Sequence, residues 1–254
     1  MYLRAAHAES NLATLRQFIR DNPLGLLVSG IHSSNYPTLQ CSHIPWILDV
    51  ADEEDQTESG RLRGHMARQN PHSKALIEAV VASPELNGYL QDEITIMFNG
   101  PAHHYVTPKY YTETKPVTGK VVPTWNYSAV QAYGKARILH DRHDATTGTF
   151  LQKAIEDLSK QSEASLGHNE TAGAKKAWAV SDAPTAYVDL LKKNIIGIEI
   201  EITRLEGKWK MSQELGQGDR QGVIDGFNAM NTDLGRAMSS MVGQRGPPNG
   251  TTTR

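Results

Sequence analysis

Two arginines and a histidine alternate along one short stretch, which is the first candidate for chemistry. It reads Arg61-Leu-Arg63-Gly-His65-Met-Ala-Arg68-Gln-Asn70-Pro. On a strand, Arg61, Arg63 and His65 would share one face, because side chains two residues apart point the same way. A guanidinium matches phosphate or carboxylate oxygens, and a neutral imidazole could ligate haem iron or donate to a flavin. The same pattern also fits a solvated barrel exterior with a hydrogen-bonded histidine.

A second candidate segment concentrates polar and aromatic side chains in a few residues. It follows Gly119 and supplies Lys120, Thr124, Trp125, Asn126 and Tyr127. An aromatic cofactor needs an apolar wall and a few fixed polar groups, which these residues could provide. A hairpin corner whose Trp and Tyr fill the core fits the composition equally well.

A third candidate is a pair of lysines around a tryptophan, Lys208-Trp209-Lys210. These residues follow an Ile-rich strand, so the sequence places the cations at a strand end. There Lys208 could close over an anionic cofactor. A solvated strand end with one buried Trp is at least as good an interpretation.

Several other chemistries lack the residues they need. The single cysteine, Cys41, excludes an internal disulfide and a Cys-rich metal site. His103 and His104 are neighbours, so on a strand they would point to opposite faces and could not ligate one metal together. The sequence has no Gly-rich phosphate loop and no Gly-x-Ser-x-Gly elbow. The formal net charge of −2 argues against nucleic-acid binding by bulk charge.

The elements that must position these residues follow from the hydrophobic pattern. Asn70 and Pro71 are typical of a helix N-cap followed by proline at the first helical position. Helices are predicted over 11–21, 71–83, 144–162, from about 184, and over 219–230. Strands are predicted over 24–29, 38–48, 61–66, 94–99, 102–106, 121–139 and 196–202. Because regular crossover helices do not separate the strands, we expect a mainly β fold (α+β), an antiparallel barrel with peripheral helices.

The chain has 254 residues, which fits one β-rich domain with extensions. We expect that domain to span 1–230 and a disordered tail to span 231–254, where apolar content is low. No stretch is apolar enough for a transmembrane helix, and the first residues do not form a signal peptide. A cytoplasmic location and no membrane partner are therefore expected.

Motifs along most of the chain resemble the PaiB family, described as FMN-binding, PaiB-type transcriptional regulators. They are Met1-Tyr-Leu3, Pro23-Leu-Gly-Leu-Leu-Val28, Ser42-His-Ile-Pro45, Leu62-Arg-Gly-His-Met-Ala-Arg-Gln-Asn-Pro71, Phe98-Asn-Gly-Pro101, Gly119-Lys-Val-Val-Pro-Thr-Trp-Asn-Tyr127, Trp178-Ala-Val-Ser-Asp-Ala-Pro184, Ile196-Gly-Ile-Glu-Ile200 and Leu205-Glu-Gly-Lys-Trp-Lys-Met-Ser-Gln213. The resemblance covers about residues 1–226. Acidic residues within 51–58 and longer segments at 80–92 and after 226 depart from it.

The resemblance implies an FMN-binding split barrel of the pyridoxamine 5′-phosphate oxidase type, usually a homodimer with cofactor sites at the subunit interface. A related branch, the piperazate synthases, uses haem to form a nitrogen–nitrogen bond, with a histidine on the iron. Here His65 corresponds to that histidine, the only predicted metal ligand.

The sequence thus predicts a homodimeric protein that binds FMN or, alternatively, haem, and a small-molecule substrate or ligand. The alternatives are a piperazate synthase-like enzyme and a regulator without enzymatic activity. The regulator is the weaker reading, since no helix-turn-helix with a basic helix is found. The predicted catalytic residues are His65, Lys120 and Tyr127. The predicted cofactor-binding residues are Arg63, His65, Arg68, Asn70, Lys120, Thr124, Trp125, Asn126, Tyr127 and Lys208.

Overall fold

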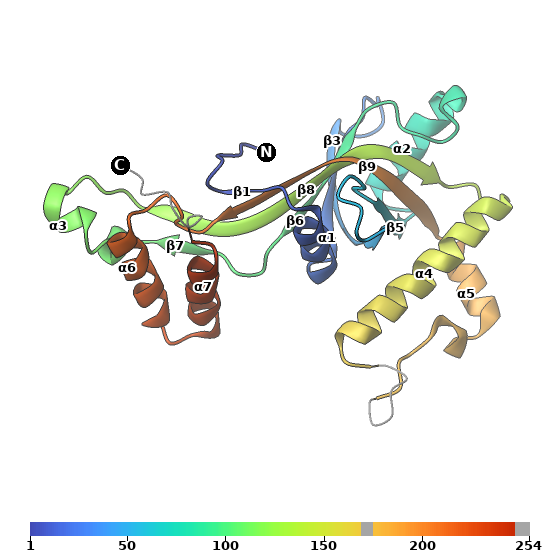
Figure 1. Cartoon of the computed structure of the whole chain (residues 1–254). Helices are drawn as coiled ribbons and strands as arrows, with labels where there is room; N and C mark the ends of the chain where they lie inside the picture. Colours follow the sequence, from blue (N-terminus) through green and yellow to red (C-terminus); the bar gives the residue numbers. More distant parts are fainter. Residues whose placement is uncertain (169–174, 247–254) are drawn as a thin grey trace. The chain divides into compact units, whose positions relative to one another are not determined.

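The computed structural model describes residues 1–168 and 175–246 and divides into two compact units (Figure 1). The first unit contains Met1–Phe18, Asn99–Gln131 and the chain from Glu206 onward. The second unit contains Ile19–Phe98 and Ala132–Leu205. The chain therefore passes from one unit to the other several times, and the single domain expected over 1–230 stays a prediction.

The helices and strands are as follows. The helices are α1 (Leu12–Asp21), α2 (Pro71–Ala82), α3 (Thr114–Thr118), α4 (Ala145–Ser165), α5 (Thr185–Lys192), α6 (Gln217–Asn228) and α7 (Asp233–Gln244). The strands are β1 (Ala8–Glu9), β2 (Leu24–Gly30), β3 (Leu39–Pro45), β4 (Ile47–Asp49), β5 (Arg61–Ala67), β6 (Ile94–Asn99), β7 (His104–Val106), β8 (Thr124–Leu139) and β9 (Ile195–Lys210). Because β8 and β9 are long, each contributes residues to both units.

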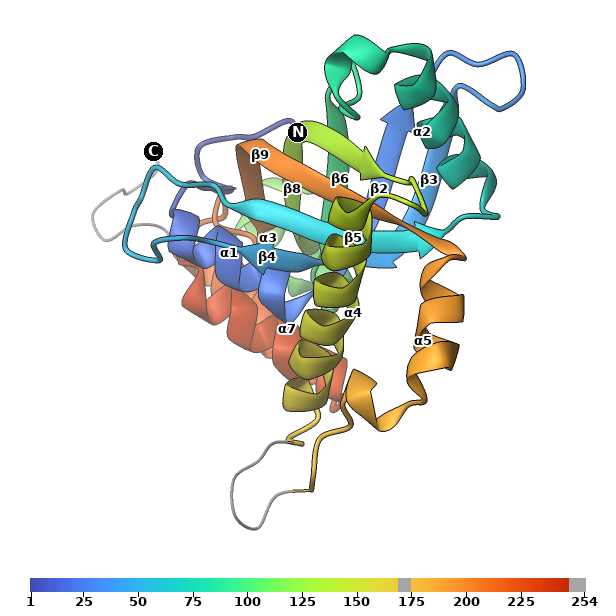
Figure 2. The same ribbon diagram turned by 90° about the vertical axis from the view of Figure 1, so that its right-hand side faces the viewer.

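The sheet of the second unit has the order β3-β2-β6-β8-β9-β5-β4. Its two ends are joined by the chain itself, since only Trp46 separates β3 from β4 while β3 pairs with β2 and β4 with β5. The sheet must therefore curl, and α4 lies across β5 on its outside (Figure 2). This arrangement confirms the predicted mainly β fold with peripheral helices, an antiparallel split-barrel type of sheet.

The corner at Trp46 is fixed by close packing. The indole is only 1% exposed. A Cβ added to Gly25 would lie 2.8 Å from Trp46 Cδ1, and one added to Gly64 would lie 2.9 Å from Cε3. Only glycine leaves room for the ring at both positions. The ring that lies close to Gly64 is therefore the indole of Trp46.

The predicted start of α2 is confirmed. Asn70 Oδ1 accepts a hydrogen bond from the backbone N–H of His72 at 2.9 Å, and Pro71 is the first helical residue. This cap fixes the turn between β5 and α2. Arg68 and Asn70 are thereby held at the end of the strand that carries His65.

Some expectations about elements are corrected. The tail predicted as disordered from 231 forms helix α7, because Met238 and Val242 are fully buried where α7 packs on α6. The remainder of that predicted tail, 247–254, lies outside the described residues. A short helix, α3, forms in a segment where no helix or strand was predicted. Strand β9 continues to Lys210, so Lys208 lies within a strand. No helix in the described ranges is long and apolar enough to span a membrane.

Candidate functional site

Strand β5 presents Arg61, Arg63 and His65 on one face, as the alternation predicted. Leu62 and Met66 point to the opposite side and are buried in the core. The unbroken antiparallel register with β9 pairs Arg63 with Glu199 and His65 with Gly197. The basic face of β5 is the side against which α4 packs, as the Arg63 contact below shows.

Arg63 is held between two carboxylates. Its Nη2 donates to Asp49 Oδ1 at 2.8 Å and to Asp157 Oδ2 at 2.7 Å, and its Nε donates to Asp49. The hydrogen bonds that Arg63 donates to Asp49 and then to Asp157 raise the pKa of its guanidinium, against the effect of burial. Lys153 also bonds to Asp157, at 2.8 Å. Arg63 therefore joins β4, β5 and α4, and these contacts occupy most of its hydrogen-bonding capacity.

His65 is half-buried, and no side chain in the described ranges hydrogen-bonds to its ring. Burial lowers the pKa of His65, so the imidazole is neutral near pH 7. Beside it, the ring of Phe150 lies over Gly197, since a Cβ added there would be 2.6 Å from the ring. A neutral imidazole next to an aromatic ring offers a nitrogen lone pair or a hydrogen-bond donor to a ligand.

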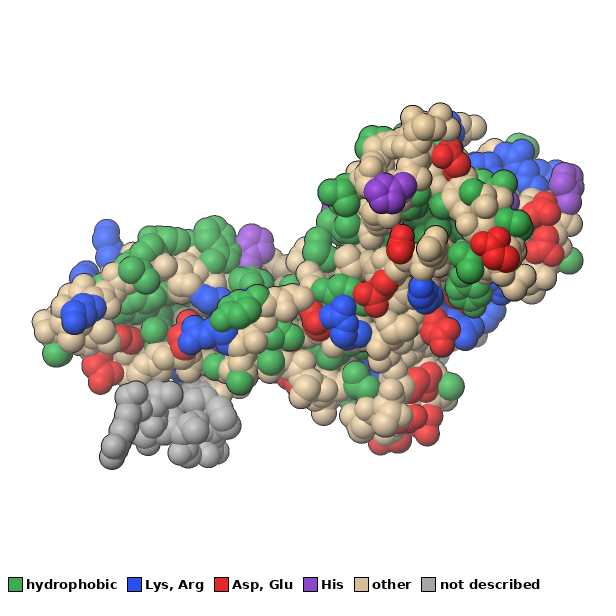
Figure 3. Space-filling model, turned by 90° about the horizontal axis from the view of Figure 1, so that it is seen from above, with side chains coloured by type: hydrophobic (Ala, Val, Ile, Leu, Met, Phe, Trp, Pro, Cys, Tyr) green, Lys and Arg blue, Asp and Glu red, His purple; other side chains and the backbone are tan. Residues whose placement is uncertain are grey.

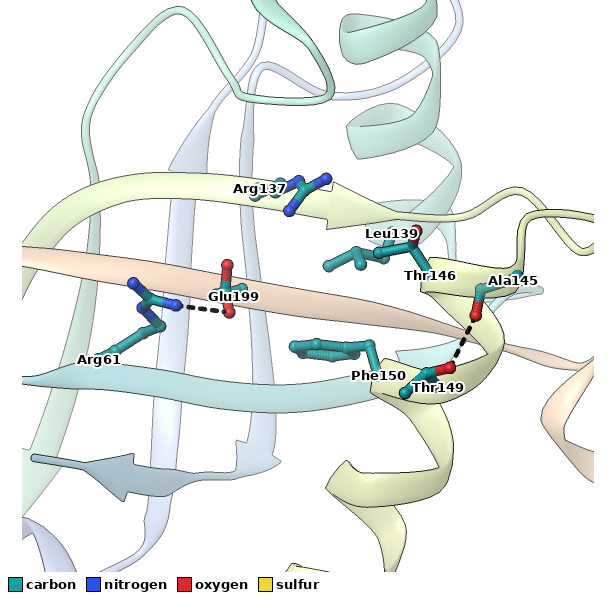
Figure 4. Close-up of a pocket in the computed structure, with 8 residues that line it drawn as sticks. All are labelled: Arg61, Arg137, Leu139, Ala145, Thr146, Thr149, Phe150 and Glu199. Carbon is teal, nitrogen blue, oxygen red and sulfur yellow. Dashed lines mark hydrogen bonds and ion pairs between the residues drawn. The ribbon is translucent and has the colours of Figure 1, made fainter. Parts of the chain in front are cut away.

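A hollow of about 540 Å³ opens on the same face, next to Phe150 (Figure 4). We call it the cofactor hollow. Arg61 from β5, Glu199 from β9 and Arg137 from β8 point into it, and Phe150 reaches in from α4. Arg61 Nη1 donates to Glu199 at 3.2 Å, and the Arg137 guanidinium has no ion pair within the described part of the chain. The remaining lining residues are Leu139, Ala145, Thr146 and Thr149.

Arg68 projects to another side of the second unit. Its guanidinium donates to the backbone oxygen of His140 and, at 3.5 Å, to that of Ile195. Burial lowers the pKa of Arg68, and the charge of Arg142 adds to this effect. Asn70 caps α2 and donates to Ser42 Oγ at 3.3 Å. Neither Arg68 nor Asn70 lines the cofactor hollow.

The other predicted site residues belong to the first unit. Asn126 is fully buried and donates to Ser212 Oγ at 3.0 Å, and Thr124 Oγ1 accepts from Lys210. Lys208 Nζ donates to the backbone oxygen of Tyr2 at 3.1 Å and lies 5.5 Å from the centre of the Tyr127 ring.

Two residues of this group face solvent. Trp125 is half exposed; its Nε1 donates to His103 Nδ1 at 3.4 Å, and its ring contacts that of Tyr105. Lys120 is exposed on the turn after α3. The first unit therefore combines buried hydrogen-bonded groups with an exposed aromatic pair. The predicted site residues divide between the two units, and their cofactor-binding and catalytic roles stay predictions.

Sequence reasoning missed the groups that surround β5. Glu199 is visible in the sequence as a polar residue between the isoleucines of β9, but nothing local links it to Arg61. Asp49, Arg137 and Phe150 come from separate elements. In the described residues, no group of three or more His, Cys, Asp or Glu side chains could hold a metal ion.

Comparison with known proteins places the chain in a family. An uncharacterised protein of Emericella nidulans is 59% identical and covers 97% of this chain and 98% of its own. The Bacillus subtilis Protease synthase and sporulation protein PAI 2 is 24% identical over 89% of this chain and 88% of its own. A solved structure of a conserved hypothetical protein from Mycobacterium tuberculosis is 12% identical, with a TM-score of 0.46, and covers 85% of this chain and 95% of that chain. A family profile described as "Putative FMN-binding domain" matches residues 1–204. The chain therefore belongs to the family of FMN-binding domains that its PaiB-type motifs indicated.

Proposed function

We propose that the protein binds FMN in the cofactor hollow and acts as a flavin-dependent redox protein. The observation that carries this proposal is the meeting of Arg61, Arg137 and the Phe150 ring in one hollow, in a chain whose family is described by FMN binding. FMN is proposed rather than another planar anion because the family is described by FMN binding and the hollow combines cations with an aromatic ring.

The residues of the hollow fit the chemistry of FMN. A volume of about 540 Å³ lies within the usual range of small-molecule and cofactor sites, roughly 300–1,000 Å³. Phe150 and Leu139 would supply an apolar wall for the flavin ring, and Arg61 and Arg137 would hold the phosphate. The Glu199 carboxylate repels an anion, so its ion pair with Arg61 must break or rearrange when FMN binds. That pair is weakly held, because Arg61 is 53% exposed.

Bound FMN would supply hydride or single-electron transfer. The chain's own contribution would be to exclude water with Phe150 and α4, to orient the phosphate through the guanidiniums, and to offer the neutral His65 imidazole as a hydrogen-bond donor or acceptor. Burial lowers the pKa of His65 and so favours the neutral form of this ring. Lys120 and Tyr127, predicted as further catalytic residues, belong to the first unit.

Haem is a second candidate cofactor, and one specific observation favours it. His65 is neutral and has no hydrogen-bond partner among the side chains of the described residues, which leaves a ring nitrogen available for iron. Arg61 and Arg137 would then bind the propionates. A piperazate synthase-like reaction would require this cofactor, and a purely regulatory role would require neither His65 nor the hollow.

The absorption spectrum of the protein, purified from cells supplied with both riboflavin and a haem precursor, tests these proposals. A flavin spectrum that weakens in the Arg61→Met/Arg137→Met double variant would support FMN. Lys160→Met, an exposed change on α4 outside the hollow, should leave the spectrum unchanged. A Soret band that is lost in His65→Ala would decide for haem. A wild-type protein that takes up neither cofactor, even after reconstitution, would overturn both.

A further inference from the structure

We propose that the second unit carries a binding site for a phosphate group where the β8–α4 connection meets the end of α5 and the start of β9. We call it the phosphate hollow. Its lining is unusually rich in cations: Arg68, Arg142, Lys192 and Lys193, with Asp141 and Asp189 as the acidic members. Basic and histidine side chains gather at the right-hand end of Figure 3, the end at which the β8–α4 connection lies in Figure 1.

The cations of this hollow are only partly neutralised. Lys192 pairs with Asp189 at 2.9 Å and with Gln152 Oε1 at 2.8 Å. Within the described ranges, Arg142 and Lys193 form no ion pair. Asp141 accepts a hydrogen bond from the backbone N–H of His143 at 2.9 Å. An excess of positive charge therefore remains for a ligand to balance.

Arg68 is already fixed in place at the edge of the hollow. Backbone oxygens of His140 and Ile195 hold one of its nitrogens, and its Nε is buried without a hydrogen-bond partner. Carbonyl oxygens orient a guanidinium but do not neutralise its charge. Burial and then the charge of Arg142 lower the pKa of Arg68, and the charge of Asp141 opposes them. A guanidinium oriented in this way loses little side-chain freedom on binding an oxyanion.

The phosphate hollow has two parts with volumes of about 270 and 360 Å³, which share Arg68, Asp141 and Arg142. Leu151 and Ile195 form an apolar part of the lining. The first turn of α4 contributes little, since Asp144 already accepts from the backbone N–H groups of Thr146 and Thr147. The side-chain cations are therefore the main ligand-binding groups of the site. They favour a doubly charged phosphate monoester over a single carboxylate.

The phosphate hollow differs from the cofactor hollow. The two are lined by different side chains of α4: Thr147, Gly148 and Leu151 line one, while Thr149 and Phe150 line the other. The phosphate monoester can come from a free metabolite or, in place of the assignment to Arg61 and Arg137, from the phosphate of FMN. Binding of a free phosphate ester to the apoprotein does not require the proposed cofactor site.

Isothermal titration calorimetry of the apoprotein in low-salt, phosphate-free buffer tests the site. We expect saturable binding of glycerol 2-phosphate, none of glycerol, and at least about tenfold weaker binding in Arg142→Ala/Lys193→Ala, because charge-assisted bonds carry the affinity. The control Lys175→Ala/Lys176→Ala removes the same charge elsewhere and should bind normally. Thermal unfolding of the two double variants shows whether both remain folded.

FMN and riboflavin, titrated in the same way, distinguish the two sources. If the hollow takes the phosphate of FMN, Arg142→Ala/Lys193→Ala weakens FMN and leaves riboflavin unchanged. If it takes a free ester, both flavins bind that variant as they bind the wild type. No binding of glycerol 2-phosphate to the wild type, or equal binding to the wild type and Arg142→Ala/Lys193→Ala, would overturn the proposal. The absorption spectrum measures cofactor uptake independently of this titration. Failure of the proposed cofactor site and failure of the phosphate hollow can therefore be distinguished.

Discussion

His72 is enclosed between two serine hydroxyls in the core of the second unit. Its Nε2 lies 2.8 Å from Ser29 Oγ and its Nδ1 lies 3.0 Å from Ser42 Oγ. The side chain is 1% exposed, and burial lowers the pKa of His72 from 6.5 to about 4. One neutral ring can donate to one hydroxyl and accept from the other, so this arrangement joins β2, β3 and α2 without placing a charge in the core.

The fold should therefore lose stability in acid through this residue. As pH falls from 6.5 to about 4, the unfolded chain binds a proton at His72 that the folded chain does not, so the free energy of unfolding decreases. The loss attributable to His72 is about 3 kcal/mol at full extent. Urea unfolding at pH 7.5 and 4.5 measures it. His72→Gln should show a smaller pH slope than the wild type. Identical slopes in the wild type and His72→Gln would contradict this assignment.

Glu199 is the acidic residue of the cofactor hollow, and it should weaken anionic ligands. Removing its charge in Glu199→Gln frees Arg61 and takes a negative charge away from the phosphate. We expect about fivefold tighter FMN binding, since such a partly exposed charge is worth ~1 kcal/mol. Quenching of flavin fluorescence in a titration measures the change. Riboflavin, which lacks the phosphate, serves as the control and should bind both proteins alike. Weaker FMN binding by the variant would show instead that Glu199 orders Arg61 for the ligand.

At the scale of residues, the sequence predicted which face of an element a side chain occupies better than it predicted which residues that side chain contacts. The alternation of Arg61, Arg63 and His65 and the cap at Asn70 are local properties, and both are confirmed. The partners of Arg63 are not local, since Asp157 lies 94 residues away on α4. Pleating determines which face a side chain occupies, whereas tertiary packing determines which element covers that face.

At the scale of elements, α4 must approach β9 closely for the cofactor hollow to form. Gly197 permits this approach, because a Cβ there would be 2.6 Å from the Phe150 ring. Gly197→Val should lower the free energy of unfolding by about 1–3 kcal/mol and reduce cofactor uptake, because overpacking displaces α4. The urea midpoint and the absorption spectrum measure the two effects.

A glycine of α4 itself supplies the matched control. A Cβ added to Gly148 meets nothing within 4 Å, so Gly148→Ala should raise the free energy of unfolding by about 0.5–1 kcal/mol through better helix propensity. If Gly197→Val were as stable as the wild type, α4 would not depend on this glycine for its position.

The lengths of elements were predictable only where a clear pattern continued. The isoleucines of β9 alternate up to Ile202 and are buried as expected. Beyond them the strand continues to Lys210 through polar residues, because backbone pairing with a neighbouring strand does not require an apolar face. Similarly, α7 was missed because its buried large apolar side chains, Met238 and Val242, are too sparse to produce a clear helical period.

At the scale of the whole molecule, the homodimer implied by the family resemblance remains a proposal, and exposed aromatic surface supports it. Tyr105 and Trp125 are register partners on β7 and β8, their rings are 6.3 Å apart, and they are 42% and 48% exposed. Val117 and Val122, from the same part of the sequence, are also exposed. Hydrophobic side chains gather over the first unit, the left part of Figure 3. Aromatic residues on the surface are typical of protein interfaces.

Tyr105→Asp should therefore shift the protein from dimer toward monomer, because a carboxylate in a closed apolar interface is costly to desolvate. Light scattering coupled to size exclusion measures the mass across a concentration series. The matched control is Val81→Asp, which places the same charge on an exposed apolar residue of α2 and should stay dimeric. A wild-type protein of monomer mass at every concentration would refute the dimer. A wild-type dimer unaffected by Tyr105→Asp would place its interface on another surface, and the exposed aromatic pair would then need a different partner.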